Sequence, residues 1–209
     1  MCIRDSLMRD ELLFSEKIFN NVGSAAILMD INNGEILSML SMPDFDLNKR
    51  EKITDKNYIN RATKAIYELG SVFKTFTFTA GLNENLIDVD SEFKNLEKRI
   101  RCGKNIISEY DEEIPENITA EEILVRSGNI GSVRIAQKIG IEKFKSFLDK
   151  LGITEKIDFD IEEVGSPLPL TWGKCKLATS SFGHGITTTA LQLTKAYAII
   201  SNGGLSLIH

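Results

Sequence analysis

Two almost wholly apolar runs, separated by a short polar turn, constrain the fold of this chain more than any other feature. The first run covers residues 25–29, and the second covers residues 36–42, where only small serines interrupt it. Between them, Asn32-Asn33-Gly34 is typical of a hairpin turn, and Pro43 closes the second strand. Strands that are apolar on both faces need cover on both faces, so we expect central strands of a sheet sandwiched between helices.

Helical patterns occupy much of the remaining chain. Apolar residues at near-helical spacing predict an amphipathic helix over residues 7–19. Thr119 and Glu122 have the spacing of a capping box, which predicts a short helix that begins at Thr119. Further helices are predicted over residues 133–139 and 144–151, which end at Gly140 and Gly152, and over residues 188–201, which end before Gly203-Gly204.

Two segments are harder to interpret. Residues 75–79 alternate as a strand does, but Gly70-Ser71 followed by Val72, Phe73 and Phe76 fits a buried helix with serine at its start, and we favour the helix. Residues 86–118 are charged and show little periodicity, so we expect an extended loop with short strands there.

Composition excludes several classes of protein. The chain has 209 residues, of which 42% are apolar, so it can supply a real core. With 26% charged residues and no run of about eighteen apolar positions, nothing in it is expected to span a bilayer. A net charge of -5 argues against duplex nucleic acid as a partner. Residues 1–6 lack the apolar core of an export signal.

The cysteine and histidine content narrows the chemistry. Cys2, Cys102 and Cys175 are an odd number with no C-x-x-C pair, and the only histidines are His184 and His209. Zinc fingers, thioredoxin-like redox sites and histidine triads therefore lack their residues. Chemistry must rest on Ser, Lys, Asp, Glu or a bound cofactor.

Ser71 and Lys74 form an S-x-x-K pattern at the start of the predicted apolar helix. The i, i+3 spacing places the hydroxyl and the amine on one helix face, where they can act as nucleophile and base. A helix N-terminus favours an oxyanion, and an amine among apolar side chains has a lowered pKa. The alternative is a capping serine followed by a lysine whose stem lies along apolar surface.

The pattern at Ser71 and Lys74 is weak evidence for catalysis when it is taken alone, because the chain contains a second S-x-x-K. A chain of this length contains roughly one such pattern by chance. Ser91 and Lys94 match the letters, but they lie in a charged stretch with no glycine turn before them and no apolar helix after them. We assign this second pattern to a solvated loop.

Ser127-Gly128-Asn129 adds a second candidate motif. It is the only S-x-N triplet in the chain, and it interrupts two predicted helices, where its side chains can project inward. A hydroxyl and an amide in that position suit a carbonyl-bearing substrate. Ser, Gly and Asn are also common turn residues, so the triplet gains weight only because it follows Ser71 and Lys74 in order.

Together, these motifs resemble the transpeptidase domain of class B penicillin-binding proteins, most closely the septal, cell-division branch. The resemblance runs from about Gly23 to Gly204. The hairpin carries part of it. The other matching segments are residues 41–46, 60–62, 67–74, 127–131, 181–186 and 191–193.

The resemblance implies an α+β fold of the penicillin-binding-protein and β-lactamase type. Such a fold has an antiparallel sheet flanked by helices and an all-helical subdomain. On this basis we expect residues 1–22 to be an N-terminal edge and linker helix, with 1–6 foreign to the family. Residues 23–205 would be a partial transpeptidase domain that lacks its C-terminal sheet strands, and 206–209 a truncation edge.

The resemblance also assigns roles to residues of this chain. Ser71 would be acylated by the penultimate D-alanine of a peptidoglycan stem peptide, Lys74 would take the serine proton, and the Ser71 N–H would supply half of the oxyanion hole. Ser127 would relay a proton to the leaving amine and contact substrate, and Asn129 would hydrogen-bond the substrate and Lys74. Gly183 and Gly185 would line the substrate site, with His184 only filling that loop.

One expected motif is absent. The Lys-Thr-Gly or Lys-Ser-Gly of the family does not occur, since the only Lys-Thr, at residues 74–75, precedes Phe76. That motif lies on the strand that supplies the other oxyanion donor. We therefore expect the 209 residues by themselves to be inactive or weakly active, and the family's membrane anchor and pedestal domain to lie outside them.

The expected partners are peptidoglycan stem peptides that end in D-Ala-D-Ala, β-lactams and membrane-bound division proteins, with no nucleic acid, no cofactor and no metal. The expected location is the bacterial inner membrane, with the catalytic domain facing the periplasm. Four alternatives stay open: a non-catalytic binding module, an elongation-type transpeptidase, a serine β-lactamase and a β-lactam sensor. The Ser-Gly-Asn motif disfavours the Ser-Asp-Asn pattern of class A β-lactamases and the Ser-x-Val pattern of class D.

Overall fold

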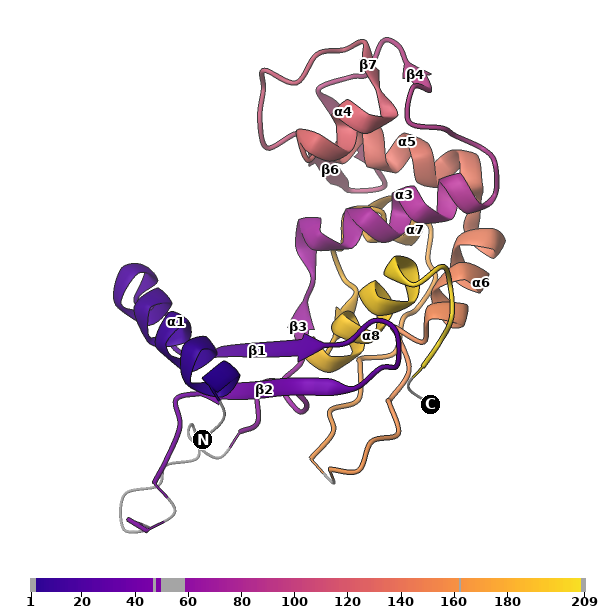
Figure 1. Cartoon of the computed structure of the whole chain (residues 1–209). Helices are drawn as coiled ribbons and strands as arrows, with labels where there is room; N and C mark the ends of the chain where they lie inside the picture. The colour runs from indigo at the N-terminus through magenta and orange to yellow at the C-terminus, as the bar shows by residue number, and fades with distance from the viewer. Residues whose placement is uncertain (1–2, 47, 50–58, 162, 208–209) are drawn as a thin grey trace. The chain divides into compact units, whose positions relative to one another are not determined.

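The computed structural model describes residues 3–46, 48–49, 59–161 and 163–207 (Figure 1). The chain divides into two compact units, each assembled from separate stretches of sequence. The first unit comprises Met1–Tyr67, Leu151–Leu168 and Thr187–His209, and the second comprises Glu68–Lys150 and Pro169–Ile186. The expected boundaries after residues 22 and 205 stay predictions.

The predicted hairpin is confirmed in the first unit. Strands β1 (Ser24–Met29) and β2 (Ile36–Met42) pair antiparallel, with Ala26 opposite Leu40. The turn closes through a hydrogen bond from the Gly34 N–H to the Asp30 carbonyl, 2.8 Å long. Within the described residues each strand pairs only with the other, so the expected central placement in a larger sheet is not seen. Helices α1 (Ile3–Phe19) and α8 (Ala190–Ser201) contact the pair, as expected of helical cover.

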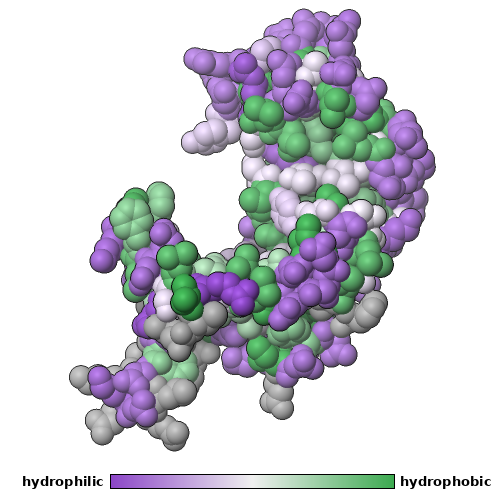
Figure 2. All heavy atoms as spheres, viewed as in Figure 1, coloured by the Kyte–Doolittle hydropathy of each residue, from purple (hydrophilic) through white to green (hydrophobic). Residues whose placement is uncertain are grey.

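Both terminal helices of the first unit were predicted, with shifted starts. Helix α1 (Ile3–Phe19) begins four residues before the predicted start, buries none of its residues and exposes apolar side chains (Figure 2). Helix α8 (Ala190–Ser201) begins two residues after its predicted start, because Thr189 caps it. The Gln192 N–H donates to Thr189 Oγ1 at 3.1 Å, and the Gln192 side chain completes a capping box.

The second unit contains the helical region and several short strands. The predicted helix after Gly70 is confirmed as a 3₁₀ turn, η2 (Gly70–Phe73), that runs into α3 (Lys74–Asn83). Ser71 does not cap it, because neither element has a side-chain cap. The remaining helices are α4 (Ala120–Val125), α5 (Asn129–Ile139), α6 (Ile141–Leu151) and α7 (Lys176–Ser180), of which α7 was not predicted.

Residues 86–118 form the predicted loop with short strands. Strand β4 (Glu92–Phe93) pairs with β7 (Ile118–Thr119), and β5 (Arg99–Cys102) pairs with β6 (Asn105–Ser108). The capping box predicted at Thr119 is present, since the Glu122 N–H donates to Thr119 Oγ1 at 3.2 Å. The two-residue segments β3 (Tyr67–Glu68) and β8 (Thr187–Thr188) complete the set of described strands.

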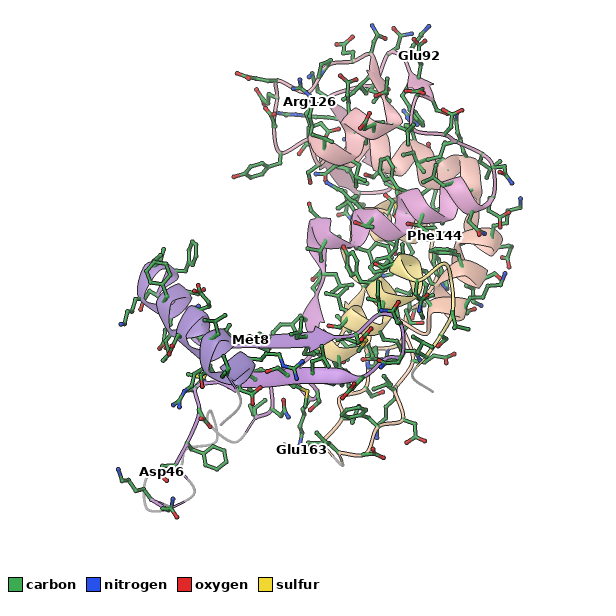
Figure 3. The ribbon with its side chains drawn as sticks, in the orientation of Figure 1. Met8, Asp46, Glu92, Arg126, Phe144 and Glu163 are labelled. Atoms are coloured by element: carbon green, nitrogen blue, oxygen red, sulfur yellow. A yellow bond between two sulfur atoms is a disulfide. The ribbon has the colours of Figure 1, made fainter. Side chains whose placement is uncertain are left out.

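Aromatic side chains fill the core of the second unit. Phe73, Phe76 and Phe144 are fully buried. The ring centroids of Phe73 and Phe76 lie 5.4 Å apart, and Phe144 contacts Phe73 at 6.2 Å and Trp172 at 6.3 Å. Figure 3 shows Phe144 among the packed side chains of this unit. This core fixes η2 and α3, which carry Ser71 and Lys74.

A disulfide was not anticipated from the sequence. Cys102, at the end of β5, is bonded to Cys175, the residue before α7, across 73 positions of the chain. In the described part of the chain, no helix is both long and apolar enough to cross a membrane.

Candidate active site

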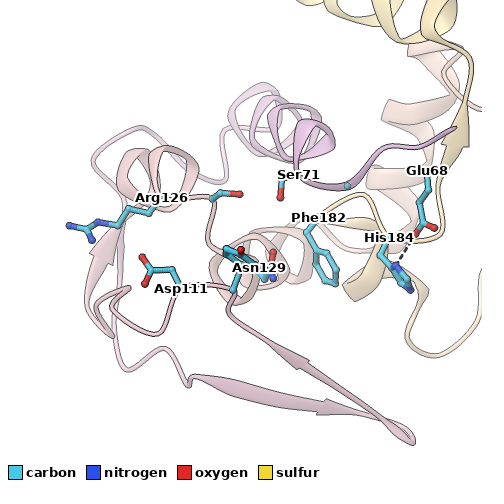
Figure 4. A pocket seen from close by; sticks show the side chains of 10 residues that line it. Glu68, Ser71, Asp111, Arg126, Asn129, Phe182 and His184 are labelled. Carbon is cyan, nitrogen blue, oxygen red and sulfur yellow. Dashed lines mark ion pairs between the residues drawn. The ribbon is translucent and has the colours of Figure 1, made fainter. Parts of the chain in front are cut away.

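A pocket of about 500 Å³ opens on one side of the second unit (Figure 4). All of its lining residues belong to that unit. It brings together three of the candidates that the sequence placed far apart, Ser71, Ser127 and Asn129. The other lining residues are Glu68, Gly70, Tyr110, Asp111, Arg126, Phe182 and His184.

Ser71 lies in the η2 turn, with its side chain directed into the pocket (Figure 4). Among the residues that the structure describes, none hydrogen-bonds to its hydroxyl, and Ser71 is exposed in the pocket. The turn is held from the other side by the glycine loop, because the Gly70 N–H donates to the Gly183 carbonyl at 3.3 Å. A Cβ on Gly183 would lie 2.0 Å from the Gly70 carbonyl oxygen, so only glycine allows this close approach.

Lys74 sits one turn further on and is 1% exposed. Its ammonium donates hydrogen bonds to the Ser127 carbonyl and, at 2.9 Å, to the Ser127 hydroxyl. Burial lowers the pKa of Lys74 from 10.5 to about 8, and the negative charge of Glu109 opposes this shift. The alternative of a lysine that reaches solvent is therefore wrong, and a neutral amine is accessible near neutral pH.

Ser127 occupies the sharp turn between α4 and α5. Its backbone has φ +55°, a left-handed conformation that is uncommon for serine. The turn is closed at both ends, since the Ser127 N–H donates to Leu124 at 3.0 Å and the Gly128 N–H donates to Ile123 at 2.8 Å. The strained turn aims the Ser127 hydroxyl at Lys74, a geometry that the motif alone did not reveal.

Asn129 is the first residue of α5 and lines the pocket. Its side-chain amide donates to the Ser108 carbonyl at 2.9 Å. The expected hydrogen bond between Asn129 and Lys74 is not formed in the described structure, where Lys74 donates to Ser127 and the Asn129 amide donates to Ser108. The arrangement leaves Ser127 as the direct partner of the buried amine.

Gly183 and Gly185 belong to the loop that supports the pocket rather than to its described lining. Gly183 contacts Gly70 through the backbone, and the Gly185 N–H donates to Glu68 Oε1 at 2.5 Å. Their expected role in substrate binding stays a prediction. Phe182 and His184, on either side of Gly183, are the residues of this loop that line the pocket.

Several pocket residues were not predicted from the sequence as parts of a site. His184 Nδ1 lies 2.7 Å from Glu68 Oε1, and its ring stacks on Phe182 with centroids 6.4 Å apart, so it does more than fill the loop. Glu68 lies three residues before Ser71 and Arg126 directly before Ser127, and this closeness to the motifs is a signal that could have found them. Tyr110 and Asp111 come from a charged stretch with no motif, and only the fold brings them to the pocket.

The pocket therefore presents the accessible hydroxyl of Ser71 and further polar groups. The buried amine of Lys74, whose pKa is lowered, lies behind this lining and is hydrogen-bonded to the Ser127 hydroxyl. Such a set can transfer a proton from the serine to the amine as the serine attacks a carbonyl carbon. In the described ranges, no group of three or more His, Cys, Asp and Glu side chains is placed to hold a metal ion.

Comparison with known proteins identifies the family. Residues 24–207 match the family model described as the penicillin binding protein transpeptidase domain. The chain therefore belongs to the penicillin-binding protein transpeptidase family, and the resemblance to its class B, septal branch is confirmed.

Curated relatives have matching names. The chain is 32% identical over 198 residues to the probable peptidoglycan D,D-transpeptidase FtsI of Caulobacter vibrioides, covering 94% of this chain and 33% of that protein. It is 30% identical to the stage V sporulation protein D of Bacillus subtilis, covering 95% of this chain and 31% of that protein. The chain thus spans about a third of the length of these two relatives.

Solved structures support the fold. The apo structure of the TP domain from Burkholderia pseudomallei penicillin-binding protein 3 matches with a TM-score of 0.82 at 20% identity, over 97% of this chain and 58% of that chain. A peptidoglycan glycosyltransferase from Burkholderia ambifaria matches with a TM-score of 0.84 at 20% identity, over 97% of this chain and 61% of that chain. The predicted α+β fold of the penicillin-binding-protein type is confirmed.

Proposed function

We propose that this chain carries the serine-acylation centre of a peptidoglycan D,D-transpeptidase that acts in septal cell-wall synthesis. The observation that carries the proposal is the buried Lys74 amine, which donates to Ser127 in the same pocket that exposes the Ser71 hydroxyl. The names of the FtsI relatives support the reaction class.

In the first half-reaction, Ser71 Oγ attacks the carbonyl carbon of the penultimate D-alanine of a stem peptide. The serine proton passes to the neutral amine of Lys74, and the carbonyl becomes a tetrahedral oxyanion next to the Ser71 N–H. As the C–N bond breaks, a proton passes from Lys74 through the Ser127 hydroxyl to the leaving nitrogen. Terminal D-alanine departs and an ester to Ser71 remains.

In the second half-reaction, an amino group of another stem peptide attacks the ester carbonyl. Its nitrogen loses a proton through the same Ser127 and Lys74 pair, and Ser71 Oγ regains one as the ester C–O bond breaks. The product is a peptide cross-link and a free enzyme. A β-lactam would acylate Ser71 in the same way, because its strained amide replaces the D-Ala-D-Ala bond.

The proposed setting is the inner membrane of a bacterium, with the catalytic centre in the periplasm. The bond between Cys102 and Cys175 supports this location, because disulfides persist in oxidising compartments such as the periplasm. Division proteins in the same membrane would be its partners.

Labelling with a fluorescent penicillin, followed by a denaturing gel, tests the proposal on the complete gene product. We expect a stable label on the wild type, none on Ser71→Ala and a normal label on Ser91→Ala. Ser91 is a matched control because it belongs to the second S-x-x-K.

Four outcomes would contradict the proposal. A folded complete protein that takes no label would favour the non-catalytic binding module. Rapid release of hydrolysed penicillin would indicate a serine β-lactamase. Stable labelling without cross-linking of stem peptides would point to a β-lactam sensor, and depletion that blocks elongation rather than septation would point to the elongation branch.

A further inference from the structure

Glu109 is a buried carboxylate that the proposed reaction does not yet use. It lies directly after β6, with only 9% of its surface exposed. Its two oxygens accept hydrogen bonds from consecutive backbone N–H groups, Oε2 from Asn129 at 2.6 Å and Oε1 from Ile130 at 2.8 Å. A buried carboxylate with this pairing is placed to hold a specific backbone segment.

That segment is the start of α5. The N-cap residue of this helix is Gly128, which has no side chain to satisfy the first N–H groups, and no side-chain cap is formed. Glu109, which lies twenty positions earlier in the chain, accepts hydrogen bonds from the first N–H groups of the helix instead. Its negative charge also suits the positive end of the helix dipole.

The contacts of Glu109 bear directly on the site. The carbonyl of Ser108, the residue before Glu109, accepts a hydrogen bond from the side-chain amide of Asn129. Ser108 and Glu109 together therefore hold both the side chain and the backbone N–H of Asn129. Ser127 lies two residues before Asn129, in a turn whose left-handed backbone conformation is unfavourable for serine. Without Glu109, the start of α5 loses two hydrogen bonds, and the Ser127 hydroxyl is held less firmly against Lys74.

We propose that Glu109 is a positioning residue for acyl transfer, which holds the N-terminus of α5 so that the Ser127 hydroxyl stays hydrogen-bonded to Lys74. The inference rests on the proposed function of Ser71 and Lys74. It adds a residue outside the recognised motifs to the machinery of the site.

The charge of Glu109 has a second effect on Lys74. It raises the pKa of Lys74 against the lowering by burial, so its removal lowers that pKa further. Lys74 donates to Ser127 in the turn before α5, and it feels the negative charge of Glu109, the residue directly after β6. The other ionisable groups of the pocket are Glu68, Tyr110, Asp111, Arg126 and His184.

The test compares Glu109→Gln, Glu109→Asp and Glu113→Gln in the complete gene product. Glu113 is an exposed carboxylate of the same segment, so its variant removes one charge without touching α5. The measured quantity is the second-order rate constant of Ser71 acylation by a fluorescent penicillin as a function of pH, with thermal unfolding as the check on folding.

We expect Glu109→Gln to lower the maximal rate constant by about 10- to 100-fold, the effect of losing a hydrogen-bonded buried charge. The pH at which the rate constant of this variant is half-maximal should fall. The reactive form has a neutral Lys74, and the pKa of Lys74 is lower without the charge of Glu109. Glu109→Asp keeps the charge and should keep the wild-type pH midpoint with a smaller loss of rate. Glu113→Gln should match the wild type.

A Glu109→Gln variant with the wild-type rate and pH midpoint would overturn the proposal. So would a loss of rate with an unmoved midpoint, which is what a merely structural role gives. If Glu109→Gln does not fold, Glu109→Asp decides, since a shifted midpoint there contradicts the proposal. If the wild type takes no label, the proposed function fails separately, and the pKa of Lys74, measured by NMR with labelled lysine in these variants, still tests the effect of Glu109.

Discussion

The two S-x-x-K segments have the same letters and opposite environments. Lys74 is buried in the second unit and donates to Ser127, whereas the side chain of Lys94 is 66% exposed and lies 2.6 Å from Glu92. Burial lowers the pKa of Lys74, and the hydrogen bond to Glu92 raises the pKa of Lys94. The same spacing thus gives a buried amine of lowered pKa in one place and a solvated cation in the other.

The serines differ in the same way. The hydroxyl of Ser91 donates to Asp88 at 3.0 Å and accepts from the Asp88 N–H at 2.9 Å, so it closes a local turn. Ser71 precedes a buried helix and faces the pocket. The two S-x-x-K segments differ because only the first has a glycine turn before its serine and an apolar helix after it. These neighbours decide whether the serine and lysine are removed from water.

Removal of each lysine gives the largest expected contrast. Lys74→Ala should lower the rate constant of acylation by about 10²- to 10⁴-fold, the usual contribution of a general base. Lys94→Ala should leave it unchanged. Stopped-flow labelling of the complete gene product measures both, and thermal unfolding shows that each variant is folded. Equal losses in the two variants would break the comparison.

Removing an apolar side chain should reduce stability far more near the first S-x-x-K segment than near the second. Phe76 is fully buried in α3, so Phe76→Ala should lower the free energy of unfolding by about 3–5 kcal/mol. Val89, two residues before Ser91, is 53% exposed. Val89→Ala should therefore change the free energy of unfolding by less than about 0.5 kcal/mol. Urea titration of each variant measures the difference. A small effect at Phe76 would show that the helix is not anchored as described.

The ion pair of the second segment should have the smallest effect. Glu92 lies at the outer edge of its unit (Figure 3), and both partners of its contact with Lys94 are exposed. Glu92→Gln should leave the free energy of unfolding unchanged within error, because surface pairs contribute little. The pKa of Lys94, followed by NMR, should fall toward its ordinary value while that of Lys74 stays. A marked loss of stability would contradict the assignment to a solvated loop.

Local signals in the sequence predicted much of the fold. The hairpin and the capping boxes involve residues a few positions apart, so turn chemistry and spacing were sufficient. The starts of α1, α5, α6 and α8 were misplaced because propensity alone does not locate a helix end. Extra strands beside β1 and β2 were expected from burial, and the described chain does not contain them.

The site was predicted only where motifs mark it. Ser71, Lys74, Ser127 and Asn129 follow from spacing and family resemblance. Glu109 and the Cys102–Cys175 bond were missed, because each depends on contacts between segments about 20 and 73 positions apart. No local pattern encodes such contacts, since they form only when the core of the unit brings the segments together.

Peptide mapping tests the central claim, that Ser71 and not Ser91 is the nucleophile, most directly. The complete gene product is incubated with benzylpenicillin, digested, and its peptides are analysed by mass spectrometry. The account predicts that the peptide with Ser71 gains the mass of one whole penicillin, because the ring opens without loss of atoms, and that the peptide with Ser91 is unmodified. An adduct on Ser91 or elsewhere, with Ser71 unmodified, would contradict it.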